Sequence, residues 1–255
     1  MPSFRFLAPA LLALALGSAP LSASAESFSD TQRGDIEAIV KNYLIAHPEV
    51  LEEAMNELSK RQAAAETEKH EASVAKNSDA IFNSPRGVTL GNKDGDVTFV
   101  EFFDYNCGYC KRAMADMLDL MKADPKLKVV LKEFPVLSQG SVEAAQVAVA
   151  VRMQDPTGKK YLDFHQKLLG GRGQADKARA LAAAKDLGLD MARIEKDMAS
   201  PEAKATIEEN FKLAEEMGMN GTPSYVIGKQ IVVGAVGLDG LKEKIGVARC
   251  GKATC

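Results

Sequence analysis

The sequence has little that marks a membrane protein, a nucleic-acid-binding protein or a small disulfide-stapled scaffold. Only residues 6–16 are strongly apolar, and this run is shorter than the roughly 20 apolar residues that span a bilayer. Acidic and basic side chains nearly balance, 35 against 32, so a nucleic-acid surface is not indicated. Four cysteines among 255 residues are too few to staple the fold, which therefore needs an ordinary apolar core.

The first 25 residues have the layout of a secretory signal peptide. Arg5 supplies a positive charge, the apolar run 6–16 follows, and Ala23-Ser24-Ala25 forms a small-residue cleavage pattern. We expect cleavage after Ala25, and a membrane anchor is the alternative. The 230 residues left would carry 31 basic and 35 acidic side chains and all four cysteines, which fits an exported protein in an oxidising compartment.

Residues 29–79 are predicted to be helical throughout. Ser29 or Asp30 can cap a first helix, and His47 is expected to end it because Pro48 disfavours helical geometry in the residue before it. Pro48 also suits the first turn of a second helix. The two helices carry apolar stripes at helical spacing, formed by Ile36, Ile39, Val40, Tyr43 and Leu44, and by Val50, Leu51, Met55 and Leu58.

The end of this part, residues 59–79, is polar, with Val74 as its one large aliphatic side chain. A helix without an apolar face has nothing to pack on, so we interpret this segment as an exposed stalk. The two apolar stripes need a partner, because a segment of about 50 residues buries such surface poorly alone. Other copies of the segment, the chain's own catalytic part and a membrane surface are the alternatives.

After residues 84–87 the pattern changes to alternating strands and helices, which indicates an α/β fold. Strands are predicted at residues 88–90, 97–103, 127–134, 225–227 and 231–233. Helices are predicted at 107–123, at 238–249 and over most of 141–217, with breaks at 155–156, 170–171 and 200–201. The order is strand, helix, strand, long helical insertion, hairpin and helix.

The chemistry of this part centres on Cys107-Gly108-Tyr109-Cys110. A thiolate is the form that attacks disulfides, and Cys107 opens a helix, where unpaired N–H groups favour negative charge. Cys110 lies about one turn further on the same face, in reach of Cys107. We expect Cys107 to be the exposed nucleophile with a lowered pKa, and Cys110 to be shielded with a higher pKa. A zinc site, for which no second C-x-x-C is present, and a plain structural disulfide are the alternatives.

Residues 99–110, which read Phe-Val-Glu-Phe-Phe-Asp-Tyr-Asn-Cys-Gly-Tyr-Cys, resemble the active-site segment of the DsbA-like branch of the thioredoxin superfamily. The helical insertion and the segment 221–225, Gly-Thr-Pro-Ser-Tyr, are similar to the same family. This resemblance covers residues 85–250. It implies a thioredoxin fold with a helical insertion, and a thiol–disulfide oxidoreductase that needs no cofactor and no metal ion. Gly-Tyr between the cysteines replaces the Pro-His of strongly oxidising members, so the redox direction stays open.

Three further site residues carry over by this resemblance. Pro223 matches the family's cis-proline, which lies against the redox pair and leaves backbone near Thr222 free to bind a substrate strand. Thr222 matches the variable position that tunes redox behaviour. Glu101 matches an acidic residue behind the pair, which passes protons to or from Cys110 and has a raised pKa if it is buried. A trans turn at Pro223 and a surface position for Glu101 are the alternatives.

Cys250 and Cys255 lie at the carboxyl end of the chain, with four residues between them. A structural disulfide that clips the last helix is favoured, since Gly251 gives the chain freedom to turn. A shuttle pair that exchanges with Cys107, a metal-ligand role and unpaired thiols are the alternatives.

Residues 30–62, with the core Ala-His-Pro-Glu-Val-Leu-Glu-Glu-Ala-Met-Asn-Glu-Leu, resemble the amino-terminal domain of the suppressor of copper sensitivity protein C (ScsC) group. Some members of that group trimerise through this domain. The predicted organisation is therefore a signal peptide at 1–25, an all-helical oligomerisation stalk at 26–79 and a DsbA-like catalytic domain at 80–255.

The leading hypothesis is a periplasmic homo-oligomer that acts as a disulfide isomerase or oxidoreductase. Its expected partners are unfolded or misoxidised exported proteins and a membrane redox protein that reduces or reoxidises Cys107 and Cys110, with no nucleic acid involved. A monomeric DsbA-type oxidase is one alternative. A copper-binding protein of the copper-tolerance system is another, because soft thiolates suit Cu(I).

Overall fold

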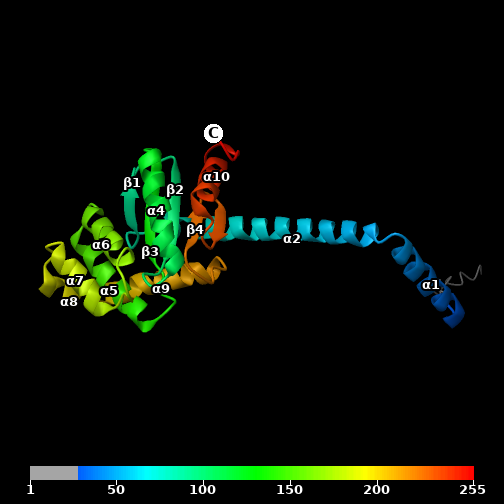
Figure 1. The fold of residues 1–255 in the computed structure, drawn as a ribbon, viewed down its shortest axis with the longest axis horizontal. Helices are drawn as coiled ribbons and strands as arrows, with labels where there is room; N and C mark the ends of the chain where they lie inside the picture. Colours follow the sequence, from blue (N-terminus) through cyan, green and yellow to red (C-terminus); the bar gives the residue numbers. More distant parts are fainter. Residues whose placement is uncertain (1–27) are drawn as a thin grey trace, which may run out of the picture. The chain divides into compact units, whose positions relative to one another are not determined.

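The computed structural model describes residues 28–255, which form two compact units that divide between Ser59 and Lys60. The predicted signal peptide at residues 1–25 lies outside the described residues. Over residues 28–255, no helix combines the length and the apolar character that crossing a membrane requires. Figure 1 shows the helices and strands in chain order.

The amino-terminal unit contains helix α1 (Asp30–Ala46) and the beginning of helix α2 (Glu49–Lys76). Ser29 caps α1 as predicted. Its hydroxyl accepts a hydrogen bond from the backbone N–H of Gln32 at 3.3 Å, and the Gln32 side chain accepts one from the N–H of Ser29 at 2.8 Å. This reciprocal capping box satisfies two N–H groups that the helix itself leaves unpaired. His47 ends α1, which confirms the predicted boundary.

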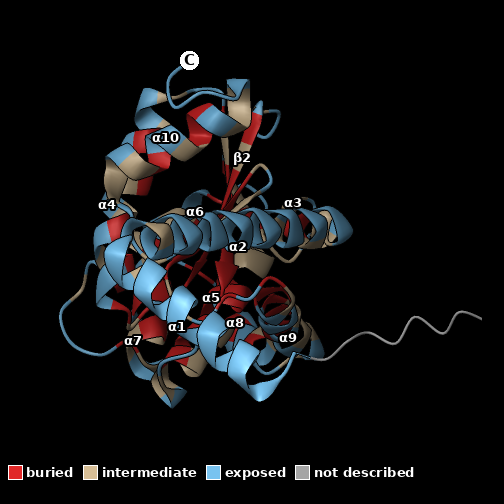
Figure 2. Cartoon of the chain, turned by 90° about the vertical axis from the view of Figure 1, so that its right-hand side faces the viewer, coloured by how far each residue is buried: buried red, intermediate tan, exposed pale blue. Residues whose placement is uncertain are grey.

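The apolar stripes of this unit are exposed along the chain, as the pale colour of α1 in Figure 2 shows. Seven of the nine stripe side chains are exposed, from 42% at Ile36 to 69% at Met55, and Leu44 and Val50 are half-buried. A group of large apolar side chains at helical spacing that is open to solvent in one chain is typical of a surface that binds another surface.

The second unit, Lys60–Cys255, contains the predicted catalytic domain, and we call it the catalytic unit. The last part of α2 is packed within it, so the prediction of an exposed stalk through residue 79 is wrong there. Val74 is 3% exposed and shares a core cluster with Ile81. The hydroxyl of Ser73 donates a hydrogen bond to the backbone carbonyl of Glu216 at 2.8 Å. A single aliphatic side chain anchors this helix end because residues far away in the sequence present an apolar surface to it.

Five strands of the catalytic unit form one mixed sheet in the order β1-β3-β2-β4-β5. Their bounds are β1 (Val88–Gly91), β2 (Val97–Phe103), β3 (Leu127–Glu133), β4 (Ser224–Ile227) and β5 (Gln230–Val233). β2 pairs parallel to β3 and antiparallel to β4, while β1 pairs antiparallel to β3. The predicted strands are therefore confirmed, and β2 is flanked on both sides.

Helices pack on both faces of this sheet, and the predicted helical insertion between β3 and β4 is confirmed. The helices are α3 (Ser78–Phe82), α4 (Gly108–Ala123), α5 (Gln139–Gln154), α6 (Lys159–Leu169), α7 (Lys177–Asp186), α8 (Met191–Met198), α9 (Pro201–Glu216) and α10 (Gly237–Cys250). The three predicted breaks in the insertion are present. A further break follows α7, where Gly188 adopts a φ of 67° that other residues rarely take.

Alternate side chains of β2 enter two different cores. Phe99 and Phe103 lie in the core that also contains Cys107 and Cys110. On the other face, the core of Val74 and Ile81 is completed by Val100, Phe102, Val130, Phe134, Leu213, Ala214, Met217, Met219 and Val226. Because both faces are buried, β2 reads as a nearly continuous apolar run in the sequence.

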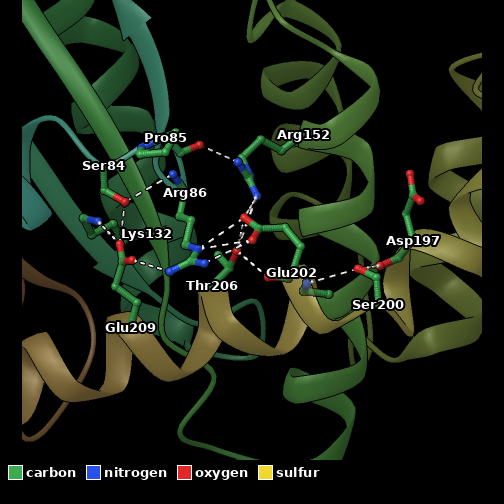
Figure 3. Close-up of polar contacts among 11 residues, drawn as sticks. Ser84, Pro85, Arg86, Lys132, Arg152, Asp197, Ser200, Glu202, Thr206 and Glu209 are labelled. Atoms are coloured by element: carbon green, nitrogen blue, oxygen red, sulfur yellow. Dashed lines mark hydrogen bonds and ion pairs between the residues drawn. The ribbon is translucent and has the colours of Figure 1, made fainter.

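A cluster of charged side chains joins the segment before β1 to α5 and α9 (Figure 3). Arg86 pairs with Glu202 at 3.2 Å and with Glu209 at 2.9 Å, and Arg152 pairs with Glu202 at 3.3 Å. Hydrogen bonding to Arg86 holds the pKa of Glu202 below its usual value. Lys132 places a fully buried amine 3.8 Å from Glu209, and burial lowers its pKa to about 8. These ion pairs fix the point at which the chain enters the sheet.

Candidate active site

Cys107 occupies the N-cap of α4, four residues after the carboxyl end of the central strand β2. The backbone N–H of Cys107 donates a hydrogen bond to the carbonyl of Asp104 at 3.1 Å, which turns the chain from strand into helix. The buried face of α4 carries Cys110, Met117 and Leu120, so the helix is pinned to the sheet along its length. The apolar strand and the amphipathic helix together place the redox pair at the helix amino terminus, as predicted.

The surroundings of Cys107 favour its thiolate. The backbone N–H of Cys110 donates a hydrogen bond to the Cys107 Sγ at 3.4 Å, which stabilises the thiolate. The carbonyl oxygen of Thr222 lies 3.1 Å from the same sulfur and accepts a hydrogen bond only from the protonated thiol. A hydrogen bond from the Cys110 thiol is the main influence that lowers the pKa of Cys107 to about 5, while burial acts in the opposite direction. At neutral pH Cys107 is therefore ionised, which is the form that attacks a disulfide.

Cys110 has the opposite character. Burial raises the pKa of Cys110 far above its ordinary value, and its hydrogen bond to Cys107 adds to this effect. Cys107 is only 5% exposed and Cys110 is 0% exposed, so the prediction that Cys107 is an exposed nucleophile is wrong. The carbonyl of Thr222 lies against the Cys107 sulfur and covers it, which spacing along the sequence does not reveal.

Glu101 lies on β2 and is 2% exposed, which rules out the surface alternative. Burial is the largest cause that raises its pKa to about 8, and the negative charges of Cys107 and Asp116 raise it further. A carboxyl group with a pKa of about 8 exchanges its proton easily near neutral pH, as a general acid or base requires.

The loop before β4 brings two more predicted residues to the redox pair. The Thr222–Pro223 peptide bond is cis, and the hydrogen bond from Cys107 to Thr222 joins residues 115 positions apart. The backbone N–H of Gly234 donates to the Pro223 carbonyl at 2.8 Å, and the Ser224 hydroxyl donates to the Gly221 carbonyl at 2.7 Å. These bonds hold the loop in place beside Cys107.

Two positioning residues next to the cysteines were missed by the sequence analysis. Asp104 is 1% exposed, and its carboxylate accepts hydrogen bonds from the N–H of Asn106, the hydroxyl of Ser141 and the N–H of Leu137, at 2.7, 2.7 and 2.9 Å. The Asn106 side chain exchanges two hydrogen bonds with the backbone of Ala175, at 2.8 and 2.7 Å. Both residues are part of the motif at residues 99–110, so the sequence could have indicated them. Their partners Ser141 and Ala175 lie in the helical insertion, which the motif does not reveal.

Four exposed apolar side chains lie on segments connected to the redox pair, and we call Tyr109, Val136, Leu137 and Val233 the apolar rim. Their exposed fractions lie between 38% and 59%. The guanidinium of Arg112 lies over the Tyr109 ring, 4.4 Å from its centroid. Leu137 is tied to Asp104 through its N–H, and Val233 precedes the residue that is bonded to Pro223. The rim therefore comes from three parts of the chain: the start of α4, the connection between β3 and α5, and the end of β5.

Cys250 and Cys255 form a disulfide at the end of α10. Arg249 beside it pairs with Asp124, the C-cap of α4, at 2.8 Å, whereas Cys107 is the N-cap of that helix. A helix of 16 residues separates these ends by about 25 Å at 1.5 Å per residue. The disulfide therefore cannot exchange with Cys107 of the same chain. Over residues 28–255, no group of three or more His, Cys, Asp and Glu residues is arranged to hold a metal ion.

Comparisons with known proteins bear on both parts of the chain. A family model described as "DSBA-like thioredoxin domain" matches residues 98–246, and one described as "Copper resistance protein ScsC N-terminal domain" matches residues 32–65. A thioredoxin-like oxidoreductase from Silicibacter pomeroyi DSS-3 is 44% identical with a TM-score of 0.64, and the match covers 67% of this chain and 96% of that one. Proteus mirabilis ScsC in a transitional conformation is 29% identical with a TM-score of 0.63, covering 88% of this chain and 97% of that one.

Curated relatives match the chain at lower identity. Disulfide bond formation protein D of Bacillus subtilis (strain 168) is 27% identical, and the match covers 61% of this chain and 74% of that protein. The chain spans only 25% of the length of the Na(+)/H(+) antiporter NhaA 1 of Salinispora arenicola (strain CNS-205), to which it is 24% identical over 65% of its own length.

The DSBA-like model covers more than half of the chain and includes both cysteines of the redox pair and the cis-proline. The fold agrees, with a helical insertion between the parallel strand pair and the hairpin. The chain belongs to the DsbA-like thioredoxin family and carries an amino-terminal segment of the ScsC type.

Proposed function

We propose that this chain is a periplasmic protein thiol–disulfide oxidoreductase that acts as a disulfide isomerase on exported proteins. The observation that carries the proposal is the contrast within the redox pair. The pKa of Cys107 is lowered to about 5, while burial raises the pKa of Cys110. One sulfur is thus ready to attack at neutral pH, and the other is held as a thiol until a mixed disulfide has formed.

The reaction begins when the Cys107 thiolate attacks a client disulfide. A bond forms between the Cys107 sulfur and one client sulfur, and the other client sulfur leaves as a thiolate. The client thiolate can then attack elsewhere in the client, which reshuffles its disulfides and finally returns Cys107. If reshuffling stalls, Cys110 attacks Cys107, transfers its proton to the Glu101 carboxylate and releases the reduced client. A carboxyl with a pKa of about 8 suits that transfer.

A protein client fits the surroundings of the sulfur better than a small molecule does. The apolar rim offers side chains of an unfolded chain a place to pack, and its members are exposed by 38% to 59%. By resemblance to the family, backbone near Thr222 would pair with an extended client segment in the manner of an added strand. Main-chain pairing is independent of client sequence, as an enzyme that serves many exported proteins requires.

Isomerase activity is the finer part of the proposal and depends on the amino-terminal unit. Its stripes expose Ile39 by 67% and Tyr43 by 54%, and the matching family model is that of the ScsC amino-terminal domain. Association through these stripes would place several Cys107 groups around one client, which keeps a misfolded chain bound while its disulfides are exchanged. A membrane redox partner would keep the pair reduced.

A second candidate is a monomeric oxidase that donates its disulfide. The low pKa of Cys107 favours it, because stabilising the thiolate stabilises the reduced pair and makes the disulfide more oxidising. Copper binding by the two thiolates is a third candidate, which the "Copper resistance protein" description of the amino-terminal family model favours.

Three assays on the mature chain separate these functions. Reactivation of a scrambled disulfide protein by the reduced chain supports isomerisation, and oxidation of a reduced protein by the oxidised chain supports the oxidase. Tight binding of one Cu(I) per chain with neither activity supports the copper protein. The Cys107→Ser variant is the control in all three, and activity that survives this change would contradict the assignment of the redox pair.

A further inference from the structure

A buried tyrosine lies beside Glu101 on the sheet face that carries the redox pair. Glu101 of β2 and Tyr225 of β4 are directly opposite each other in the antiparallel ladder. Side chains in such a pair project from the same face, with Cβ atoms about 4.5–5.5 Å apart. The two residues are 2% and 0% exposed, and Tyr225 lies in the same core cluster as Cys107 and Cys110.

Both side chains keep a polar atom without a protein partner. Within residues 28–255, Glu101 Oε2 and the Tyr225 hydroxyl are buried and make no hydrogen bond. Burying a hydroxyl without a partner costs about 1–3 kcal/mol. Phenylalanine would fill the same space and pack on Phe99, whose ring centroid is 5.2 Å from that of Tyr225, without this cost. A hydroxyl kept at such a site needs a reason other than packing.

The other buried tyrosines of this core show what a structural hydroxyl looks like. Tyr161 donates a hydrogen bond to the carboxyl group of Glu133, and Tyr105 donates one to the same oxygen at 3.2 Å. These two phenols are satisfied in the resting protein, unlike the phenol of Tyr225.

The charged and titratable groups that face Glu101 and Tyr225 come mostly from one helix. They are Cys107, Cys110 and Asp116, all at or on α4. From β3, the neighbour of Glu101 is Leu131, and Glu133 lies one pair further along the same face. From α10, the buried side chains are Leu241 and Ile245. Burial and the nearby negative charges raise the pKa of Tyr225, so its phenol keeps its proton and acts as a donor.

We propose that Tyr225 is a positioning residue for proton transfer in the resolving step, where its hydroxyl donates a hydrogen bond, directly or through one water molecule, to the Glu101 carboxylate. This inference rests on the proposed role of Glu101. In that step the proton of Cys110 moves to Glu101, a disulfide forms between Cys110 and Cys107, and the bond from Cys107 to the client breaks. The electron pair of that bond leaves with the client sulfur. A donor to the carboxylate keeps a fraction of Glu101 ionised, and therefore able to accept the proton, at neutral pH.

The test follows the resolving step directly with the Tyr225→Phe variant. The reduced chain is mixed with an aromatic disulfide of nitrobenzoate, whose thiolate product is yellow. A first release of colour reports attack by Cys107, and a second reports attack by Cys110. We expect the first phase to be unchanged. The midpoint of the second phase against pH should rise by about one unit, which makes that phase about tenfold slower below the midpoint. Tyr225→Met is the second variant if the first folds poorly.

Tyr161→Phe is the matched control, because it removes the same atom from an equally buried phenol that has partners. It should lower the melting temperature and leave the pH profile in place, whereas Tyr225→Phe should move the profile and leave the melting temperature equal or higher. A Tyr225→Phe profile that coincides with that of the unaltered chain overturns the inference.

The Glu101→Gln variant separates this failure from a failure of the proposed function. If Glu101→Gln removes the pH dependence of the second phase and Tyr225→Phe leaves it in place, only the role of Tyr225 is wrong. If neither variant changes the second phase, the proposed role of Glu101 is wrong, and the inference falls with it.

Discussion

The two units of the chain depart from the ordinary distribution of side chains in opposite directions. The amino-terminal unit exposes large apolar residues, with Ile39 at 67% and Tyr43 at 54%. The catalytic unit buries ionisable ones, since Glu101, Lys132 and Glu133 are at most 5% exposed. Globular proteins usually do the reverse in both cases. Each departure costs free energy in the isolated chain. Under the proposed function, the first unit would bind another surface through its exposed apolar residues, and Glu101 of the second unit would accept a proton.

The wholly and partly buried ionisable groups of the catalytic unit fall into two kinds. Those of the Arg86 cluster are matched by opposite charges within 4 Å, which is what a structural role requires. Glu101 has no such partner, and the charges that act on it are negative. Unmatched burial of this kind shifts a pKa toward neutral pH and is found most often where protons are moved.

The largest effect is expected from substitutions in the redox pair, which remove the chemistry of the catalytic unit. Cys107→Ser should abolish thiol–disulfide turnover, because the attacking sulfur is lost. Cys110→Ser should trap mixed disulfides, because no second sulfur remains to release the client. Gel mobility without reductant measures the trapped species. The Cys250→Ser, Cys255→Ser double variant is the control and should keep full turnover, because its disulfide lies at the far end of α4 from Cys107.

Removal of the amino-terminal unit should leave the second unit working alone. Deleting residues 26–59 spares the buried end of α2 with Val74, so the catalytic unit should fold and oxidise dithiols at an unchanged rate. Isomerisation should fall to the level of a monomer. Ile39→Asp should have the same effect by placing a charge in the apolar stripe, and Lys41→Asp on the same exposed helix is its control. The mass in solution reports the oligomeric state of each variant. A full-length chain that is already monomeric at micromolar concentration would contradict association through the apolar stripes.

Glu101→Gln should slow the resolving step by about 100-fold at pH 7, because a general base is lost. Its effect on stability has a definite sign. The folded pKa of about 8 lies above the unfolded value near 4.3, so the folded chain binds the extra proton and loses stability as pH rises between the two. Over that range the variant should gain about 1.4 kcal/mol per pH unit relative to the unaltered chain.

Glu133→Gln is the matched control for this change. Burial also raises the pKa of Glu133 to about 8, so the same trend in stability is expected from denaturant unfolding across pH. The carboxyl group of Glu133 is bonded to Tyr161, and Cys110 is not among the groups that shift its pKa, so the resolving step should keep its rate. Equal kinetic effects in the two variants would mean that burial alone, and not position behind Cys110, explains Glu101.

The sequence predicts this site to the extent that the site is local. Cys107 and Cys110 are one helical turn apart, and the residues directly before and after Cys107 predict the strand and the helix that flank it. Pro223 could be found only through the family motif, because 115 residues separate Thr222 from Cys107. Local sequence patterns do not predict contacts between segments that are far apart in the chain.

Three features show this limit. Val74 stands alone on a polar helix, and its burial depends on a core formed by residues that follow it in the chain. Asn106 is recognisable as part of a motif, but its partner Ala175 lies in a loop of the insertion. The position of Tyr225 opposite Glu101 follows from the register of two strands that are far apart in the sequence. Periodicity reports which face of a strand is buried, but it does not report which neighbour that face meets.

The smallest effect is expected from the ion pairs of Arg86. Unlike Glu101, these groups should affect stability and not the redox steps. Arg86→Met should lower the free energy of unfolding by about 1 kcal/mol, because the ion pairs are partly exposed to solvent and are screened by salt. Arg86 holds the pKa of Glu202 below its usual value, so this contribution is present above pH 4.3, roughly the unfolded pKa, and is lost as pH falls through the folded pKa. The unaltered chain and the variant should therefore converge in acid. Lys204→Met on the exposed face of α9 is the control and should change little. Both variants should keep the rates of both redox steps, since Arg86 acts on the fold and not on the sulfur chemistry. A slower resolving step in Arg86→Met would mean that matched and unmatched buried charges cannot be told apart by function.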